Sequence, residues 1–159
     1  MIDGMLGKLA RWLRLIGNDV EYSRDLGDKE LLRRASTSSM VLLTSDLNLY
    51  RLAVAKGVIA YLVKGKNEPE RLASIVKRFN LRLEFNPSSS RCPKCGAEIE
   101  EAPKETVRNE VPDSTYEAYD EFWICTNPYC RKIYWRGSHW KNIMEVLADT
   151  HKLLQNQTT

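Results

Sequence analysis

The 159-residue sequence predicts an α/β fold, with an open, mainly parallel sheet carrying helices on both faces, then a small cysteine-rich unit and a C-terminal helix. Through residue 85, short apolar runs alternate with amphipathic segments, an order that indicates a parallel sheet. The stretch Asn-Pro-Ser-Ser-Ser-Arg at 86–91 interrupts that order and is typical of a linker. All four cysteines follow it. We therefore expect three parts, at residues 1–85, 91–137 and 138–154.

The elements expected in the first part alternate between strand and helix. In chain order they are a strand end at 2–4, a helix over 6–16, a strand at 19–23, a helix from Asp28, a strand at 40–45, a helix over 46–57, a strand at 58–63 and a helix over 68–79. Gly17 is a natural helix stop, and Asp28 can cap the helix that it begins. The leucine-rich run at 40–45 fits a buried parallel strand.

The C-terminal part is expected to be one amphipathic helix. Ser138 precedes Trp140, Ile143, Met144 and Leu147, whose spacing places apolar side chains near one face. That face could pack back on the first part of the chain. The stretch 155–159 is expected to be frayed.

Composition argues against a membrane protein or a secreted one. The longest apolar runs are far shorter than the roughly 18 residues that a membrane helix requires. The N-terminus has Asp3 where a secretory signal would carry positive charge, and no cleavage-site pattern follows. We expect a cytoplasmic protein.

The cysteines have the spacing of zinc ligands. Cys92 and Cys95 are separated by two residues and followed by Gly96, whereas four residues separate Cys125 from Cys130. The cytosol keeps thiols reduced, so these cysteines are more plausibly metal ligands than disulfide partners. Four thiolates complete the tetrahedral coordination of a structural Zn²⁺. A dithiol redox site would explain either pair alone. It would not explain two pairs in a segment too small and polar to hold a core, so we predict a zinc ribbon.

Several carboxylates follow predicted strands. Asp3 and Asp46 come directly after the first and third strands, and Asp25 and Asp28 follow the second. Ligands of open α/β sheets gather at the carboxyl ends of the strands, where several acids without basic neighbours favour Mg²⁺ or Mn²⁺. Such a site suits phosphoryl chemistry. The alternative is structural: Asp28 and Asp46 cap helices, and Asp25 is solvated.

Charge is distributed unevenly although the formal net charge is only +3. Residues 64–82 hold six Lys or Arg against two Glu, and residues 131–141 hold four against no acid, whereas residues 97–122 hold nine acids against two bases. Lys8, Arg11 and Arg14 recur at intervals of three, near one face of the first helix. These three residues could contact phosphates near the acids, or they could form an ordinary solvated helix face.

Aromatic and basic residues are concentrated near the end of the second part. Trp135 to Trp140 hold two indoles, Arg136 and His139, a mixture that stacks on unpaired bases and neutralises phosphates. The structural alternative is that the last indole anchors the C-terminal helix and that His139 is a hydrogen-bonded structural residue. Trp12 and Trp123 are expected in the core.

Together these motifs resemble the Mut-seven C-terminal RNase domain family, over nearly the whole chain to Met144. The matching stretches are Asp3 to Arg14, Asp25 to Leu32, Leu42 to Asp46, Cys92 to Cys95 and Tyr134 to Trp140. The resemblance implies a PIN-like nuclease domain with a zinc ribbon. The chain departs from the family pattern in a first strand with only two residues ahead of Asp3, and in two extra residues within the second cysteine pair.

The resemblance also implies a metal-dependent ribonuclease. Its acidic residues match Asp3, Asp28 and Asp46, with Thr44 in the Thr-x-Asp pattern of PIN domains; Asp25 is a fourth candidate, and Glu30 falls in the same stretch. We favour Asp28 as the second acid because it opens a predicted helix facing the strand ends. The hypothesis is hydrolysis of single-stranded or structured RNA by a metal-activated water. The rival hypothesis is a non-catalytic RNA-binding module whose acids only cap helices.

Overall fold

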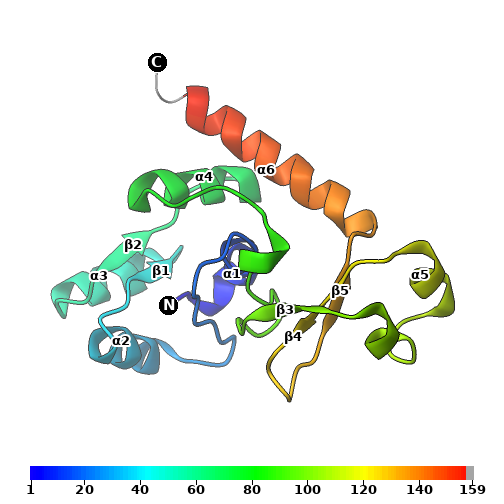
Figure 1. Cartoon of the computed structure of the whole chain (residues 1–159). Coiled ribbons are helices and arrows are strands. Elements are labelled where there is room, and N and C mark those ends of the chain that lie inside the picture. The colour runs from blue at the N-terminus through cyan, green and yellow to red at the C-terminus, as the bar shows by residue number, and fades with distance from the viewer. Residues whose placement is uncertain (157–159) are drawn as a thin grey trace.

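The computed structural model describes residues 1–156 and contains two sheets (Figure 1). The α-helices are α1 (Gly7–Leu15), α2 (Asp28–Thr37), α3 (Leu47–Ala55), α4 (Glu68–Phe79), α5 (Asp113–Ala118) and α6 (Ser138–Asn156). The strands are β1 (Leu42–Thr44), β2 (Ala60–Leu62), β3 (Ile99–Ala102), β4 (Phe122–Cys125) and β5 (Ile133–Trp135). Short 3₁₀ helices cover Gly4–Leu6 (η1), Pro87–Ser89 (η2) and Lys104–Val107 (η3). The chain is therefore an α/β protein.

The first sheet is parallel and small. β1 pairs with β2 in parallel, with Leu43 opposite Tyr61. Ile2 forms isolated parallel bridges to Leu43 on one side and Tyr22 on the other. The spatial order of the four segments is thus Tyr22, Ile2, β1, β2. The segment at Tyr22 lies on one side of Ile2, and the later strands β1 and β2 lie on the other, so the strand order reverses at Ile2. Open α/β sheets bind ligands in the crevice at such a point, which here lies beyond the carboxyl ends of Ile2 and β1.

Helices cover both faces of this sheet, as the sequence predicts. One buried cluster joins Ile2 and Leu43 to α1, α4 and Leu147 of α6. The other joins Met1 and Leu42 to α2 and α3. Neighbouring residues of one strand enter opposite clusters because side chains alternate across a strand. The apolar faces predicted for the helices therefore form two cores.

The predicted helices are present, whereas the predicted strands are shorter than expected. α4 has the predicted bounds, and α2 begins at the predicted Asp28, although Gly27 and not Asp28 is its N-cap residue. The strands expected at 2–4 and 19–23 are reduced to single bridges. Tyr22 has Ile2 as its bridge partner among the described residues, and neither segment forms a longer ladder there.

The cysteine-rich unit is built on an antiparallel sheet with the order β3-β4-β5. Phe122 is fully buried and packs with Val107 and Ile133 in a third core cluster. η3 and the six-residue α5 lie between β3 and β4 and were not predicted. This unit therefore has its own small core, contrary to the expectation that so polar a segment would hold none. Apolar residues scattered through the segment form that core.

The C-terminal helix returns to the first part of the chain. α6 begins just after β5 and lies against α4 (Figure 1), with Leu147 in the core shared by α1 and α4. It includes Gln155 and Asn156, where fraying was predicted. The rest of that predicted frayed stretch, from 157 on, lies outside the described residues. None of the described helices is long and apolar enough to cross a membrane.

Candidate active site and metal centre

Asp3 and Asp46 lie at the same edge of the parallel sheet and are connected through Thr44. The Thr44 side chain is fully buried, and its hydroxyl donates a hydrogen bond of 2.8 Å to Oδ2 of Asp3. The backbone N–H of Asp46 donates to the same hydroxyl at 3.0 Å. Asp3 is only 8% exposed, and none of the described residues forms an ion pair with it. A buried carboxylate without a cation is costly, which makes this a candidate cation site.

Both acids also cap helices. Asp3 accepts from the backbone N–H of Met5 at 3.3 Å at the start of η1. Asp46 is the N-cap of α3, and its Oδ1 accepts from the N–H groups of Asn48 (2.6 Å) and Leu49 (3.2 Å). Each carboxylate still has an oxygen with spare acceptor capacity. The caps hold the two side chains in fixed orientations at the crevice.

The third expected acid stands apart from this pair. Asp28 and Asp25 are exposed, and neither carboxylate makes a hydrogen bond or ion pair with another residue of the described range 1–156. Glu30 is engaged: hydrogen bonds from Arg33 and Arg34 lower its pKa to about 2. The structure thus joins Asp3, Thr44 and Asp46, while Asp28 and Asp25 stay available at the start of α2.

The four cysteines form the one cluster of at least three Cys, His, Asp or Glu ligand atoms found within residues 1–156. Their sulfurs lie within 4.8 Å of one another, with Cys92 3.8 Å from Cys130 and Cys95 3.4 Å from Cys125. A tetrahedral ion with bonds of about 2.3 Å would place its sulfurs about 3.8 Å apart. No described pair is a disulfide. The four thiols are therefore close enough to hold a metal ion.

Tight turns present these thiols. Gly96 has a φ of +85°, and its N–H donates to the carbonyl of Cys92 at 2.8 Å, which closes the first knuckle. In the second pair, the N–H groups of Cys130 and Arg131 both donate to the carbonyl of Asn127. The two extra residues are thus taken up in a turn, and the second knuckle still aims both sulfurs inward.

Tyr134 places its hydroxyl group next to the cysteine cluster. Its hydroxyl oxygen lies 3.1 Å from Sγ of Cys92. Burial opposes ionisation of the Cys92 thiol, but hydrogen bonds from Tyr134 and from the Cys95 backbone outweigh it and lower its pKa to about 7. Burial raises the pKa of Cys125 and of Cys130. Cys92 therefore ionises more readily than Cys125 and Cys130 to the thiolate, which is the form that binds a metal.

Arg14 is buried and does not face solvent, so the expectation that it contacts RNA is wrong. It is 3% exposed, and its guanidinium donates to the carbonyls of Val20, Pro93 and Lys94 at 2.9 to 3.3 Å. Burial lowers the pKa of Arg14, an effect that the thiols of the first knuckle oppose. Arg14 therefore fastens α1 to the cysteine cluster.

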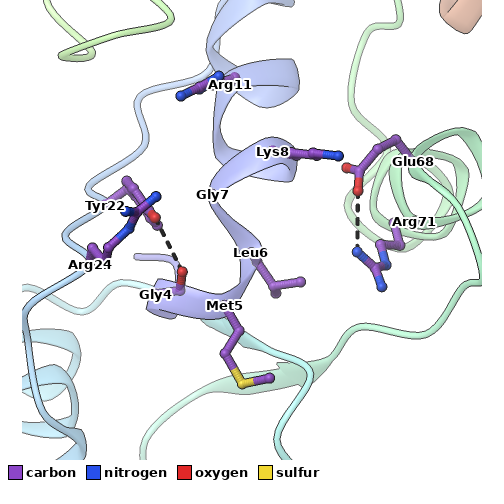
Figure 2. Close-up of a pocket in the computed structure, with 10 residues that line it drawn as sticks. All are labelled: Gly4, Met5, Leu6, Gly7, Lys8, Arg11, Tyr22, Arg24, Glu68 and Arg71. Carbon is purple, nitrogen blue, oxygen red and sulfur yellow. Dashed lines mark hydrogen bonds and ion pairs between the residues drawn. The ribbon is translucent and has the colours of Figure 1, made fainter.

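A basic cavity of about 620 Å³ is lined in part by residues 4–8, which directly follow Asp3 in the chain (Figure 2). It is bounded by Lys8 and Arg11 of α1, by Arg24 and by Arg71 of α4. Its only acid is Glu68, which pairs with Arg71 at 3.2 Å and whose other oxygen is buried without a hydrogen-bond partner. Figure 2 shows the amino group of Lys8 pointing toward Glu68. Four cations against one carboxylate give the cavity a positive potential suited to an anion.

Gly4 and Gly7 allow close packing at this cavity. The Tyr22 hydroxyl donates to the carbonyl of Gly4 at 3.1 Å, and a Cβ at Gly7 would collide with the Tyr22 ring. The Asp-Gly-Met-Leu-Gly stretch therefore brings the backbone next to Asp3 against the segment at 22–24. This packing explains both glycines of the motif.

A second cavity, of about 520 Å³, separates α1 from the antiparallel sheet and is called the aromatic cleft here. Its aromatic walls are Phe85, Trp123, Tyr134, Trp135 and Trp140, and its basic lining residues are Arg11, Lys132 and His139. Arg136 stacks over the Trp140 ring at 5.0 Å and pairs with Glu121 at 3.2 Å. Trp135 is half-buried, and His139 is exposed. Trp123 is buried as predicted, yet one side of it lines the cleft.

Sequence reasoning missed Arg24 and Arg71 as cavity residues and Phe85 as a wall of the cleft. Arg24 lies in a loop, Arg71 in α4 and Phe85 in the segment before η2. The fold brings these three segments next to α1. The excess of basic residues at 64–82 was the only signal that pointed to Arg71.

The family model of the Mut7-C RNAse domain matches residues 1–147 of the 159. No curated protein and no solved structure matches the chain.

Proposed function

Because the chain belongs to the Mut7-C RNAse domain family, a family of nuclease-like function with RNA as the implied substrate, we propose that it is a metal-dependent ribonuclease. The proposal includes a PIN-like fold for residues 1–85, a structural zinc ribbon at 91–137 and a carboxylate site for Mg²⁺ or Mn²⁺. The observation that carries it is the buried Asp3 carboxylate, held by Thr44 beside Asp46 and without a basic partner among residues 1–156.

In the proposed reaction, water adds to a phosphorus of RNA, one ester P–O bond breaks, and the leaving oxygen takes up a proton. A divalent ion held by Asp3 and Asp46, with Asp28 as third ligand and Asp25 as a further candidate, would activate that water and offset charge on the leaving oxygen. Thr44 orients Asp3, because its hydroxyl proton is committed to Oδ2.

The basic cavity would hold the RNA backbone. Lys8, Arg11, Arg24 and Arg71 line it, and Gly4 and Met5, next to Asp3 in the chain, form its edge. A phosphate bound there would lie beside the backbone that directly follows Asp3. In the ribbon, Cys92, Cys95, Cys125 and Cys130 would hold a closed Zn²⁺ site with no position for water, so the zinc would be structural. Trp135, Arg136 and His139 would contact another part of the RNA, on the side of α1 that faces the aromatic cleft.

Purified protein should cleave RNA with Mn²⁺ or Mg²⁺ and lose that activity when Asp3 or Asp46 becomes Asn. We expect each Asn variant to lower kcat/KM at least about a hundredfold, or about 2.7 kcal/mol, because the ligand charge is lost. RNA affinity should change less than about threefold. Asn caps helices about as well as Asp, so folding should be preserved.

Asp113→Asn is the matched control, since Asp113 begins α5, which lies far from the parallel sheet that carries Asp3 and Asp46 (Figure 1). Its cleavage rate should equal that of the unaltered protein. Full activity in Asp3→Asn and Asp46→Asn would refute the nuclease proposal.

A second candidate function is a non-catalytic RNA-binding module. The observation that favours it is that Asp3 and Asp46 both accept capping hydrogen bonds, which gives each a structural role without any metal. Such a module would bind RNA with no divalent ion and would cleave none of a mixed panel of single-stranded and structured RNAs. The same cleavage assay separates the two functions.

A further inference from the structure

The two cavities share one lining residue, Arg11, and so adjoin each other at this side chain. Arg11 lines both the basic cavity and the aromatic cleft, and it is exposed. It lies one helical turn after Lys8 on α1. An anion at Arg11 would therefore have the basic cavity on one side and the cleft on the other.

The cleft has the lining of a site for a flat ring. The Trp140 ring contacts Phe85, at a centroid distance of 4.6 Å, and Trp123, at 6.3 Å with an angle of 30° between the planes. Phe85, Trp135 and Trp140 remain half-buried, so each retains accessible ring surface at the cavity. Aromatic side chains that line an open cavity can stack on a further aromatic ring.

The charges of the cleft favour an occupant that is both aromatic and anionic. Among the described lining residues none is acidic, whereas Arg11, Lys132 and His139 are basic or titratable. Arg136 adds a cation at its edge, partly neutralised by Glu121. A nucleotide combines a π-face with a negative phosphate and so matches both features.

We propose that the aromatic cleft is a nucleobase subsite, which accepts one unpaired base of an RNA strand whose phosphates pass Arg11 into the basic cavity. The proposal rests on the ribonuclease function above and names its substrate class as RNA that is single-stranded at and beside the cut. A paired base is stacked within its duplex and presents no free face to the cleft. Duplex RNA would therefore occupy the basic cavity without filling the cleft.

The test alters the RNA and not the protein, because Trp140 and Trp123 also contribute to the packing of the fold, so replacing them would change stability as well as binding. A single-stranded oligonucleotide carries one abasic position, moved stepwise along its length. Its binding to the full chain is followed by anisotropy without added divalent cation and without chelator, so cleavage plays no part and bound zinc is retained. We expect the Kd to rise about tenfold, which is about 1.4 kcal/mol, at one or two adjacent positions only. Indole fluorescence should be quenched by the parent RNA and less by those abasic RNAs.

Protein variants give an independent readout. Arg11→Gln should weaken binding of the parent RNA and lower the slope of log affinity against log salt by about 0.7, the contribution of one phosphate contact on a single strand. Lys29→Gln on α2, which packs on the opposite face of the sheet, is the matched control and should leave the slope unchanged.

The outcomes separate the base subsite from the ribonuclease function. Equal affinity for all abasic RNAs, or equal affinity for duplex and single strand, overturns the subsite even if the protein cuts RNA. A position-specific loss of affinity in a protein that never cuts RNA supports the subsite and overturns the nuclease. Binding of acidic peptides with the same quenching, and no binding of RNA, overturns both.

Discussion

At the scale of single residues, Arg14 shows how helical spacing can mislead. Lys8, Arg11 and Arg14 recur every three residues, but three residues turn a helix by about 300°, so Arg14 points about 120° away from Lys8. The structure leaves Lys8 and Arg11 exposed and buries Arg14 against the first knuckle. A basic residue inside a protein needs a reason, and the carbonyls of Val20, Pro93 and Lys94 supply it.

Replacing Arg14 by Gln should destabilise the protein by about 2–4 kcal/mol, because several buried carbonyls lose a charged donor at once. Denaturant unfolding measures this change. Arg33→Gln is the control: Arg33 forms an exposed ion pair with Glu30, and solvent screening leaves such a pair little effect on the free energy of unfolding. Equal stability losses in the two variants would contradict the structural role of Arg14.

At the scale of elements, helices could be predicted from the sequence and strands only in part. α4 has its predicted bounds because Asn67 caps it, Pro69 lies in its first turn and Asn80 ends it with a φ of 50°. All of these signals are local. Strand length depends on how far the two paired segments run side by side, which local patterns do not encode, and Ile2 and Tyr22 form only an isolated bridge. α5 was missed because its six residues carry no apolar periodicity.

The candidate site was predictable to the same extent. Asp3, Thr44 and Asp46 follow neighbouring strand ends, so the topology alone brings them together. The basic cavity depends on how α4 and the loop at 22–24 pack on α1, which local patterns do not encode. The cysteine cluster was predictable because ligand spacing is a local property.

The cysteine-rich element should contain one zinc per chain. Elemental analysis of protein purified without added metal measures the stoichiometry, and we expect about one zinc, lost when Cys125 and Cys130 are both changed to Ser. Because the third core cluster is small, the β3-β4-β5 sheet should unfold without the ion. A zinc-free protein whose residues 91–137 keep native hydrogen-exchange protection would contradict this prediction.

At the scale of the whole molecule, the cysteine-rich unit is fastened to the helix that carries the cavities. The hydroxyl of Ser90 donates to the carbonyl of Leu15 at 2.6 Å, and the N–H of Arg91 donates to the carbonyl of Arg14 at 2.8 Å. Gly17 approaches Ser89 so closely that a Cβ would lie 2.8 Å from its carbonyl oxygen. α6 makes the second connection, from the end of β5 to α4 (Figure 1). The aromatic cleft exists only while both connections hold.

Loss of zinc should therefore impair RNA cleavage, although the cysteines lie apart from the carboxylates. The Cys125→Ser/Cys130→Ser variant is the sharpest test, because it removes the ion and leaves untouched the first knuckle that Arg14 contacts. With saturating Mn²⁺ we expect kcat/KM on single-stranded RNA to fall at least about tenfold, or about 1.4 kcal/mol, as the cleft and the position of α1 are lost. Cleavage of a dinucleotide too short to reach the cleft should fall less, since Asp3, Thr44 and Asp46 belong to the parallel sheet, with its own two cores. Equal losses on both substrates would mean that zinc supports the whole fold, and unchanged rates on both would show that the ribbon takes no part in catalysis.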